Sequence, residues 1–397
     1  MSTTQDLFLS PDERYDVWVV KAAERPHLLE VHSDETKNDA DPPLTDGCDI
    51  PGWRHEQLGS QHHLEVILES IGPGSTLLRR ESMLPVNSNK TPWDDLRQRL
   101  LQEPVQTPQR FAYQQLQGTL HPVFERENFP AIIDGCTEFW PAMETCRFQN
   151  LLQKYGHLEW RFSDTHGETM RLDTYQKYIA SLEGQSDDAP LAIYDSQFHH
   201  DERAALLDEY QVPSCFDTDL FEYLSDDDDD DESSQRPPYR WILIGPSRSG
   251  TGLHVDPVGT HAWVTLVEGC KRWILFAPDT DRRIIHMQDP QIPSSIWFHK
   301  YYPDVLKQVD EEGRITYVEV LQRPGETVYV PAGWPHLVLN LDLSVAITHN
   351  YATEYPSMAA LWSEINEAEP ALARRFQAAI RKMRPDLLHD NALTAQL

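Results

Sequence analysis

The sequence lacks the features of secreted, membrane-spanning and disulfide-stabilised proteins. Its five cysteines are an odd number, are widely spaced and include no CxxC pair, which argues against a disulfide framework or a thiolate zinc site. No stretch approaches about 18 consecutive apolar residues, and the first residues are polar and acidic, so we expect neither a membrane span nor a signal peptide. These absences predict a protein of the cytosol or nucleus that is not secreted.

Basic residues are also scarce, since 34 Lys and Arg oppose 64 Asp and Glu and leave a formal net charge of −30. A chain this acidic repels phosphate backbones, which disfavours direct nucleic-acid binding and favours Lys- and Arg-rich protein segments as partners. Six successive aspartates, Asp226–Asp231, predict a solvated, disordered loop over 225–235, with a docking site for basic partners as the alternative. The 40% hydrophobic residues still suffice for a sizeable core.

Many short strands are predicted after the acidic run. Apolar stretches separated by Gly and Pro turns predict strands at 239–244, 252–255, 262–267, 272–276, 326–330, 336–340 and 345–350. Such a series is typical of a barrel or a double-sheet jelly roll.

Other elements are predicted on both sides of this region. Residues 15–20 and 129–135 have the pattern of strands, and 60–71 has apolar residues at helical spacing. Residues 357–388 predict two amphipathic helices, which are more often packing or dimerisation elements than catalytic ones. We therefore expect a homodimer, if one forms, to use these C-terminal helices.

His254-Val255-Asp256 is the sharpest local feature. Alternate residues of a strand project to the same face, so the imidazole of His254 and the carboxylate of Asp256 would lie side by side on one face of the strand. His336 begins another predicted strand after the turn 331–335. Two histidines and one carboxylate can hold Fe(II) on one side and leave the opposite positions open for a co-substrate and oxygen. A single histidine is more often structural, so the strand context carries this hypothesis.

Such an iron site needs two further electrons to activate oxygen, and a 2-oxo acid can supply them by losing carbon dioxide. The far carboxylate of that acid would have to be held by a cation and hydroxyl groups. Lys271 starts one predicted strand, and Thr348 and Asn350 share a face of another. These residues are candidates for holding that carboxylate. Without His254, Asp256 and His336 nearby, they would be interpreted as an ordinary surface lysine and strand residues.

Several motifs, in this order, resemble the Jumonji C (JmjC) family of 2-oxoglutarate- and Fe(II)-dependent oxygenases, in particular its arginine demethylases and lysyl hydroxylases. They lie at 190–195, 207–213, 219–223, 236–241, 245–257, 269–273, 325–336 and 340–350. The resemblance implies a mainly β fold, a double-stranded β-helix with a jelly-roll, cupin-like core, surrounding helices and a C-terminal helical element. It also implies an acidic N-terminal extension of unknown role at 1–105, a catalytic domain at 106–355 and a helical tail at 356–397.

The resemblance also implies roles for individual residues. Fe(II) would be held by His254, Asp256 and His336. The co-substrate 2-oxoglutarate would be held by Lys271 and Thr348, with Thr251 and Asn350 lining the pocket. Such enzymes use molecular oxygen and couple the decarboxylation of 2-oxoglutarate to hydroxylation of a peptide side chain, here lysine at carbon 5. Attack on an N-methyl group of arginine would instead release formaldehyde, and nuclear residence is likewise implied only by the resemblance.

Two positions depart from the family pattern. Ala192 stands where close relatives have a tyrosine that reaches the co-substrate, and Val264 stands where they have an asparagine. Loss of these polar groups would weaken 2-oxoglutarate binding. Tyr194 lies two residues beyond Ala192, on the same face of a strand, so its hydroxyl is a candidate replacement.

Two other function classes compete with a protein oxygenase. A JmjC-fold binding module with an inactive pocket would have no chemical reason to keep three metal ligands and the lysine. An oxygenase acting on RNA or a small molecule is the other alternative, and the net charge of −30 disfavours RNA.

Overall fold

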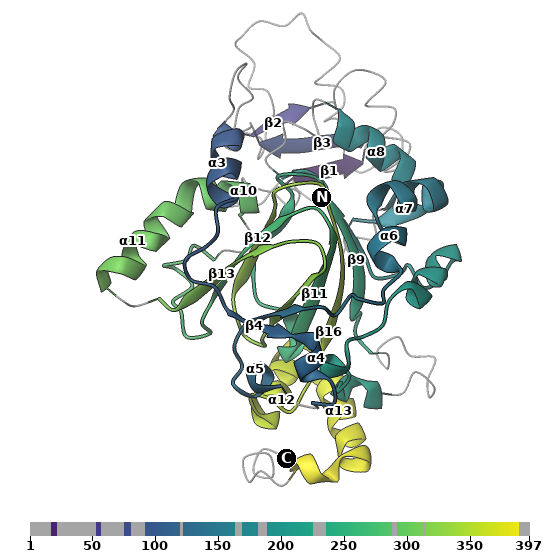
Figure 1. Cartoon of the computed structure of the whole chain (residues 1–397), viewed down its shortest axis with the longest axis vertical. Coiled ribbons are helices and arrows are strands. Elements are labelled where there is room, and N and C mark those ends of the chain that lie inside the picture. Colours follow the sequence, from purple (N-terminus) through teal and green to yellow (C-terminus); the bar gives the residue numbers. More distant parts are fainter. Residues whose placement is uncertain are drawn as a thin grey trace, which may run out of the picture.

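The computed structural model describes residues 17–21, 53–56, 75–80, 92–119, 122–162, 169–181, 189–224, 236–287, 292–312 and 315–388. Two sheets face one another around the centre of the molecule (Figure 1). The larger has seven strands in the order β4 (Gln109–Ala112), β5 (Ala131–Asp134), β14 (Glu326–Val330), β11 (His261–Glu268), β16 (Ser344–Tyr351), β9 (Arg240–Gly245) and β8 (Ile193–Asp195). The smaller has the order β10 (Gly250–His254), β15 (His336–Asn340), β12 (Lys271–Phe276) and β13 (Tyr317–Gln322).

From β9 onward the chain passes repeatedly between the two sheets. β9, β11, β14 and β16 belong to the larger sheet, and β10, β12, β13 and β15 belong to the smaller one, with antiparallel pairing throughout this set. This winding is the double-stranded β-helix, so the predicted fold class is confirmed. Each strand predicted between 239 and 350 is present with ends shifted by at most two residues, while β13 was not predicted.

Alternation along the strands builds three layers of core. In β11, Val264 faces the interior between the sheets, whereas its neighbour Trp263 faces the helices outside the larger sheet. The interior core contains Leu266, Leu275, Val320, Val328, Val338 and Ala346 from both sheets. Because both faces are covered, β11 and β12 are buried along nearly their whole length, and each contains a continuous apolar run, 262–264 and 273–276.

Helices cover the outer faces of the two sheets (Figure 1). The larger sheet packs with α6 (Ala142–Thr145), α7 (Phe148–Tyr155) and α8 (Leu172–Ala180). The smaller sheet packs with α3 (Pro92–Leu100), α10 (Ser294–Ile296) and α11 (Tyr302–Glu312). The short helices α4 (Tyr113–Leu116) and α5 (Val123–Arg126) lie between β4 and β5 along the chain.

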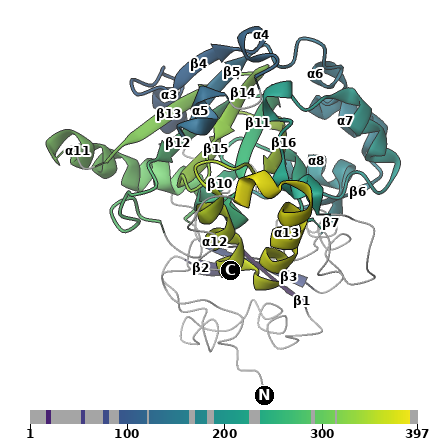
Figure 2. The same cartoon turned by 90° about the horizontal axis from the view of Figure 1, so that it is seen from below.

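The two predicted C-terminal helices are present as α12 (Met358–Ala368) and α13 (Pro370–Met383). They lie side by side below the barrel of Figure 1, as Figure 2 shows. Their apolar faces form a cluster of their own with Phe221 and Val258. This packing role matches the expectation for the tail, whereas dimerisation through it stays a prediction.

Outside the barrel, β1 (Val17–Lys21), β3 (Ser75–Arg80) and β2 (Trp53–Glu56) form a small antiparallel sheet, and β6 (Glu159–Arg161) pairs with β7 (Thr169–Arg171). The strands predicted at 15–20 and 129–135 correspond to β1 and β5. The helix predicted at 60–71 and the acidic loop at 225–235 lie outside the described residues.

The predicted boundary at residue 105 remains a prediction, although α3 packs onto the smaller sheet through Leu96 and Leu100. In the part of the chain that the structure describes, no helix has both the length and the apolar character that crossing a membrane requires.

Candidate metal centre

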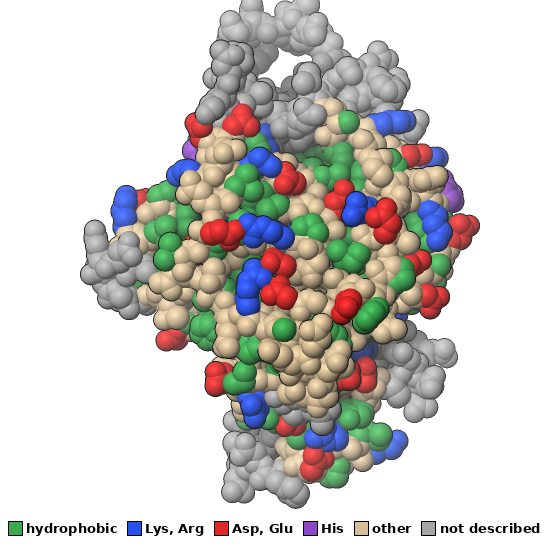
Figure 3. Space-filling model, viewed as in Figure 1, with side chains coloured by type: hydrophobic (Ala, Val, Ile, Leu, Met, Phe, Trp, Pro, Cys, Tyr) green, Lys and Arg blue, Asp and Glu red, His purple; other side chains and the backbone are tan. Residues whose placement is uncertain are grey.

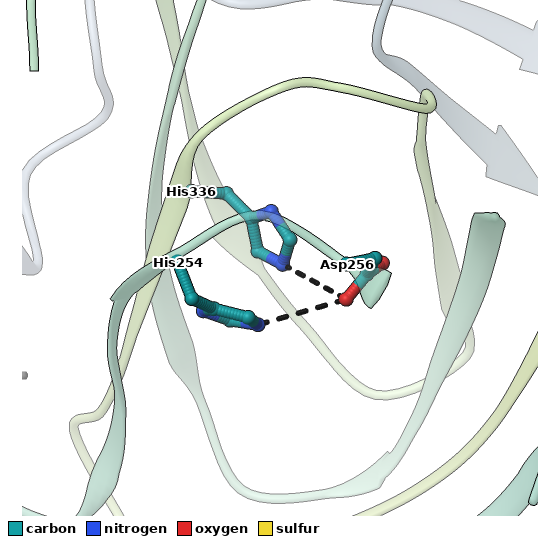
Figure 4. A group of neighbouring side chains, drawn as sticks. All are labelled: His254, Asp256 and His336. Carbon is teal, nitrogen blue, oxygen red and sulfur yellow. Dashed lines mark ion pairs between the residues drawn. The ribbon is translucent and has the colours of Figure 1, made fainter. Parts of the chain in front are cut away.

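His254 and His336 meet because the strands that carry them pair directly. His254 is the last residue of β10, His336 is the first residue of β15, and the two are opposite each other in the antiparallel register. Asp256 follows in extended conformation, with φ −61° and ψ 140°, so it stays on the same side as His254 although β10 has ended. Its Oδ1 lies 3.6 Å from Nε2 of His254 and 3.8 Å from Nε2 of His336 (Figure 4).

The second nitrogen of each histidine fixes which atom faces the centre. Nδ1 of His254 lies 2.8 Å from the Gly252 carbonyl oxygen, and Nδ1 of His336 lies 2.9 Å from the Trp334 carbonyl oxygen. A carbonyl can only accept, so both Nδ1 atoms must carry the proton and donate it. In its neutral form each ring therefore presents an unprotonated Nε2 toward Asp256, and this is the form that binds a metal ion. Burial by itself would lower the pKa of His254, but Asp256 outweighs burial and the pKa is raised, so a metal ion competes with a proton for this ring.

The electrostatics of the cluster also suit a cation. Burial by itself would raise the pKa of the Asp256 carboxyl, but His336 and His254 outweigh burial and the pKa is lowered. Burial and the neighbouring His254 lower the pKa of His336 to about 4, so this ring is neutral at pH 7. Oδ2 of Asp256 is buried without a hydrogen-bond partner among the described residues. Such an orphaned carboxylate oxygen fits a metal ligand.

A tight turn behind Asp256 holds it in place. Val258 has φ 50°, a strained value for a β-branched residue, and Gly259 has φ 68°. A Cβ at Gly259 would approach Glu364 Cβ to 3.1 Å and Leu361 Cδ1 to 3.3 Å, so the turn lies against α12. The C-terminal helices therefore support the loop that carries the carboxylate.

All the candidate site residues line one cavity of about 520 Å³. They are Tyr194, Thr251, His254, Asp256, Lys271, His336, Thr348 and Asn350. Ala192 and Val264, the two departures from the family pattern, line it too. The hydroxyl oxygen of Tyr194 is hydrogen-bonded to Oγ1 of Thr251 at 3.1 Å, so the candidate replacement for the missing tyrosine reaches the same pocket.

Lys271 is the cationic residue of the cavity. Its side chain is buried, and burial lowers the pKa of the ammonium to about 8. The ammonium donates to Oδ1 of Asn340 at 2.7 Å, and within the described ranges no carboxylate forms an ion pair with it. An unneutralised buried cation is expensive unless an anion binds there, so this end of the cavity suits a carboxylate ligand.

Asn340, Trp241 and Trp273 are among the lining residues that the sequence prediction missed. Asn340 had a usable signal, because His336, Val338 and Asn340 alternate along β15 and all three line the cavity. The two tryptophans carried no such signal, since an aromatic in a strand is more often part of a core.

The barrel and its cluster of two histidines and one carboxylate define a class: double-stranded β-helix proteins built to hold a divalent metal. Residues 241–351 match the family described as JmjC domain, hydroxylase. The chain belongs to this family, as its motifs predict.

Curated relatives agree with this assignment. The chain is 35% identical over 274 residues to a Caenorhabditis briggsae protein named bifunctional arginine demethylase and lysyl-hydroxylase. The aligned region covers 67% of this chain and 66% of that relative. It is 36% identical over 237 residues to an Arabidopsis thaliana arginine-specific demethylase, covering 58% of this chain and 43% of the relative. It is also 26% identical over 272 residues to a mouse 2-oxoglutarate and iron-dependent oxygenase, covering 62% and 60%. The chain thus spans just under two thirds of the nematode relative.

Proposed function

We propose that this chain is an Fe(II)- and 2-oxoglutarate-dependent oxygenase that hydroxylates lysine side chains of proteins. The observation that carries the proposal is a single cavity with the two histidines and the carboxylate on its wall and the un-neutralised ammonium of Lys271 within it. Two neutral imidazoles and one carboxylate are the donor set of iron oxygenases that bind a co-substrate and oxygen at the open positions. The relatives' printed names give the same chemistry for those proteins.

The residues of the chain have separate tasks in this proposal. His254, Asp256 and His336 would hold Fe(II), which when bound supplies the redox chemistry for oxidising a C–H bond with molecular oxygen. Lys271 and Thr348 would hold the far carboxylate of 2-oxoglutarate through a charge-assisted bond and a hydroxyl. The reaction balances, because 2-oxoglutarate, oxygen and a C–H bond give succinate, carbon dioxide and a hydroxylated carbon.

Basic protein segments are the substrates that the charge of the chain favours. The net charge of −30 attracts Lys- and Arg-rich peptides and raises their encounter rate. On the face shown in Figure 3, Lys and Arg side chains are interspersed with Asp and Glu, so this face offers no basic patch for a phosphate backbone.

N-methyl-arginine demethylation is a second activity of the same site. Two of the relatives are named as arginine demethylases. Oxygen insertion into an N-methyl C–H bond gives a hydroxymethyl amine, which loses formaldehyde. Nuclear residence remains a prediction from the resemblance.

Mass spectrometry of peptides tests the proposal. Lys/Arg-rich and methyl-arginine peptides are incubated with Fe(II), 2-oxoglutarate, oxygen and ascorbate, with the native chain or with His254→Ala. We expect one added oxygen on lysine with the native chain and none with the variant. His157→Ala, which removes an exposed histidine outside the cavity, is the matched control and should behave as native. No mass change, with 2-oxoglutarate unconsumed, would overturn the proposal in favour of a binding module.

Tyr194→Phe tests whether this hydroxyl replaces the missing tyrosine. The change removes one polar group from the pocket and leaves the aromatic ring, so we expect 2-oxoglutarate to bind about 3- to 10-fold more weakly. Tyr113→Phe removes a hydroxyl that bonds to Ser214 outside the cavity and should leave the affinity unchanged. Titration of both variants in the presence of Mn(II) gives the comparison. Unaltered affinity in Tyr194→Phe would remove Tyr194 from the co-substrate site.

A further inference from the structure

Asn340 is the direct neighbour of Lys271 at the cationic end of the cavity. Lys271 opens β12 and Asn340 closes β15, and the two residues are opposite each other in the antiparallel register. The loop between β9 and β10 wraps around Asn340. The Asn340 N–H donates to the Ser249 carbonyl at 2.8 Å, and the Arg248 N–H donates to the Asn340 carbonyl at 2.9 Å. Both backbone groups of Asn340 are therefore fixed.

The orientation of the Asn340 amide follows from its partners. Nδ2 lies 2.8 Å from Oγ of Ser249, whose own proton is committed to the Pro246 carbonyl at 2.6 Å. Ser249 Oγ can therefore only accept, which requires the NH₂ of Asn340 to face it. Oδ1 must then point the other way, where it accepts from the Lys271 ammonium at 2.7 Å. The network leaves the amide no alternative flip.

This arrangement is closely packed. A Cβ at Gly245 would come within 2.3 Å of Ser249 Oγ and 2.5 Å of Asn340 Nδ2, so only glycine leaves room for the network at that position. Asn340 itself is 3% exposed and Lys271 is 5% exposed. Little solvent reaches the pair, and the amide substitutes for water as the ammonium's fixed partner.

A neutral partner has a different consequence from a charged one. An ammonium has three donors, and Asn340 uses one of them and leaves two for a ligand. An amide orients the ammonium without cancelling its charge, whereas an aspartate of the same shape would form a buried ion pair and repel a second carboxylate.

We propose that Asn340 is a positioning residue that fixes the Lys271 ammonium without neutralising it, and so gives the cavity its preference for a 2-oxo acid with a second carboxylate. This inference rests on the proposed function, since it concerns how the co-substrate of that function is selected. Ser249 supports Asn340 from behind but does not itself line the cavity.

Ligand pairs that differ only in the far carboxylate test the inference. Dissociation constants for 2-oxoglutarate and for 2-oxopentanoate, which has the same chain length and a methyl group instead, are measured with Mn(II) by calorimetry or by quenching of the cavity tryptophans. Native chain, Asn340→Asp and Asn340→Ala are compared. We expect Asn340→Asp to lower the preference for 2-oxoglutarate about tenfold or more, by weakening 2-oxoglutarate and sparing 2-oxopentanoate. Asn340→Ala should lower it less, because the ammonium loses its anchor but keeps its charge.

Kinetics give a second, independent readout. With peptide substrate saturating, Asn340→Asp should raise KM for 2-oxoglutarate while kcat at saturating 2-oxoglutarate stays near native, because the metal ligands are unchanged. Asn150→Asp makes the same substitution outside the cavity, at a residue whose amide bonds to the Glu144 carbonyl, and is the matched control, with a preference within about threefold of native.

The outcomes separate the inference from the function on which it rests. If the native chain binds neither 2-oxo acid, the proposed function fails. If it binds 2-oxoglutarate and the Asn340 variants weaken both ligands equally, Asn340 is merely structural and the inference is overturned. The ratio of the two dissociation constants is measured within each variant. If Asn340→Asp fails to fold, the ratio in Asn340→Ala therefore still shows whether Asn340 affects the preference for 2-oxoglutarate.

Discussion

Asp256→Ala is expected to weaken Mn(II) or Fe(II) binding by at least about 100-fold, because loss of a residue that only supports a ligand already costs about 10- to 100-fold. Asp256 is the anionic member of the cluster, and its buried Oδ2 has no hydrogen-bond partner among the described residues. Without it, two neutral imidazoles remain, and a hard divalent cation loses the charge that compensates it. Turnover should fall below detection.

Metal binding is measured by calorimetry or by electron paramagnetic resonance of Mn(II), independently of activity. Asp304→Ala is the matched control, because it removes one negative charge from an exposed helix position where Asp304 pairs with Lys307. The control should bind metal as the native chain does. Native-like metal affinity in Asp256→Ala, with unfolding temperatures of both variants similar, would show that the cation is held elsewhere.

The barrel strands were predictable because they are buried on both faces, which leaves continuous apolar runs between Gly and Pro turns. β11 and β12 illustrate this, since their runs 262–264 and 273–276 place apolar residues both on the interior face and on the helix-covered face. β13 was missed although its sequence is rich in aromatic and β-branched residues and is followed by Pro324-Gly325. It pairs with β12 along its whole length.

The metal ligands were predictable from the spacing of two residues on one strand, although the reason needs correction. The structure ends β10 at His254, so Asp256 shares the wall with His254 because its backbone remains extended, and not because it belongs to the strand. The contact between Gly259 and α12, which holds this turn, joins residues that are far apart along the chain. Such a contact cannot be predicted from the residues around Asp256 alone.

The role of Asn340 could not be predicted for the same reason. Its amide orientation depends on Ser249 and Pro246 of the loop between β9 and β10 and on Lys271 of β12, which are two segments separate from β15. An asparagine at a strand end is ordinarily a turn residue, so its type carries no signal for a buried network. Such networks emerge only once the strands have been placed in register.

Lys271→Met is expected to weaken 2-oxoglutarate binding by at least about 100-fold, because it removes the buried cation and leaves the far carboxylate without a charge-assisted partner. Methionine has a similar length and is apolar, so the cavity keeps its shape. Binding of 2-oxopentanoate, which lacks that carboxylate, should change little. The two ligands are titrated with Mn(II) present, and equal weakening of both would indicate a collapsed pocket instead of a lost charge.

The pH dependence of binding gives Lys271 a signature that a packing residue would not have. Burial lowers the pKa of its ammonium to about 8, and only the protonated form attracts the carboxylate. As pH rises above about 8, the free protein loses this proton, so the dissociation constant for 2-oxoglutarate should increase by up to about tenfold per pH unit. Lys271→Met shares every metal ligand with the native chain, and hence any change that arises at the metal will appear in both. A slope above pH 8 in the native chain alone assigns the titration to Lys271, and parallel curves would contradict the assignment.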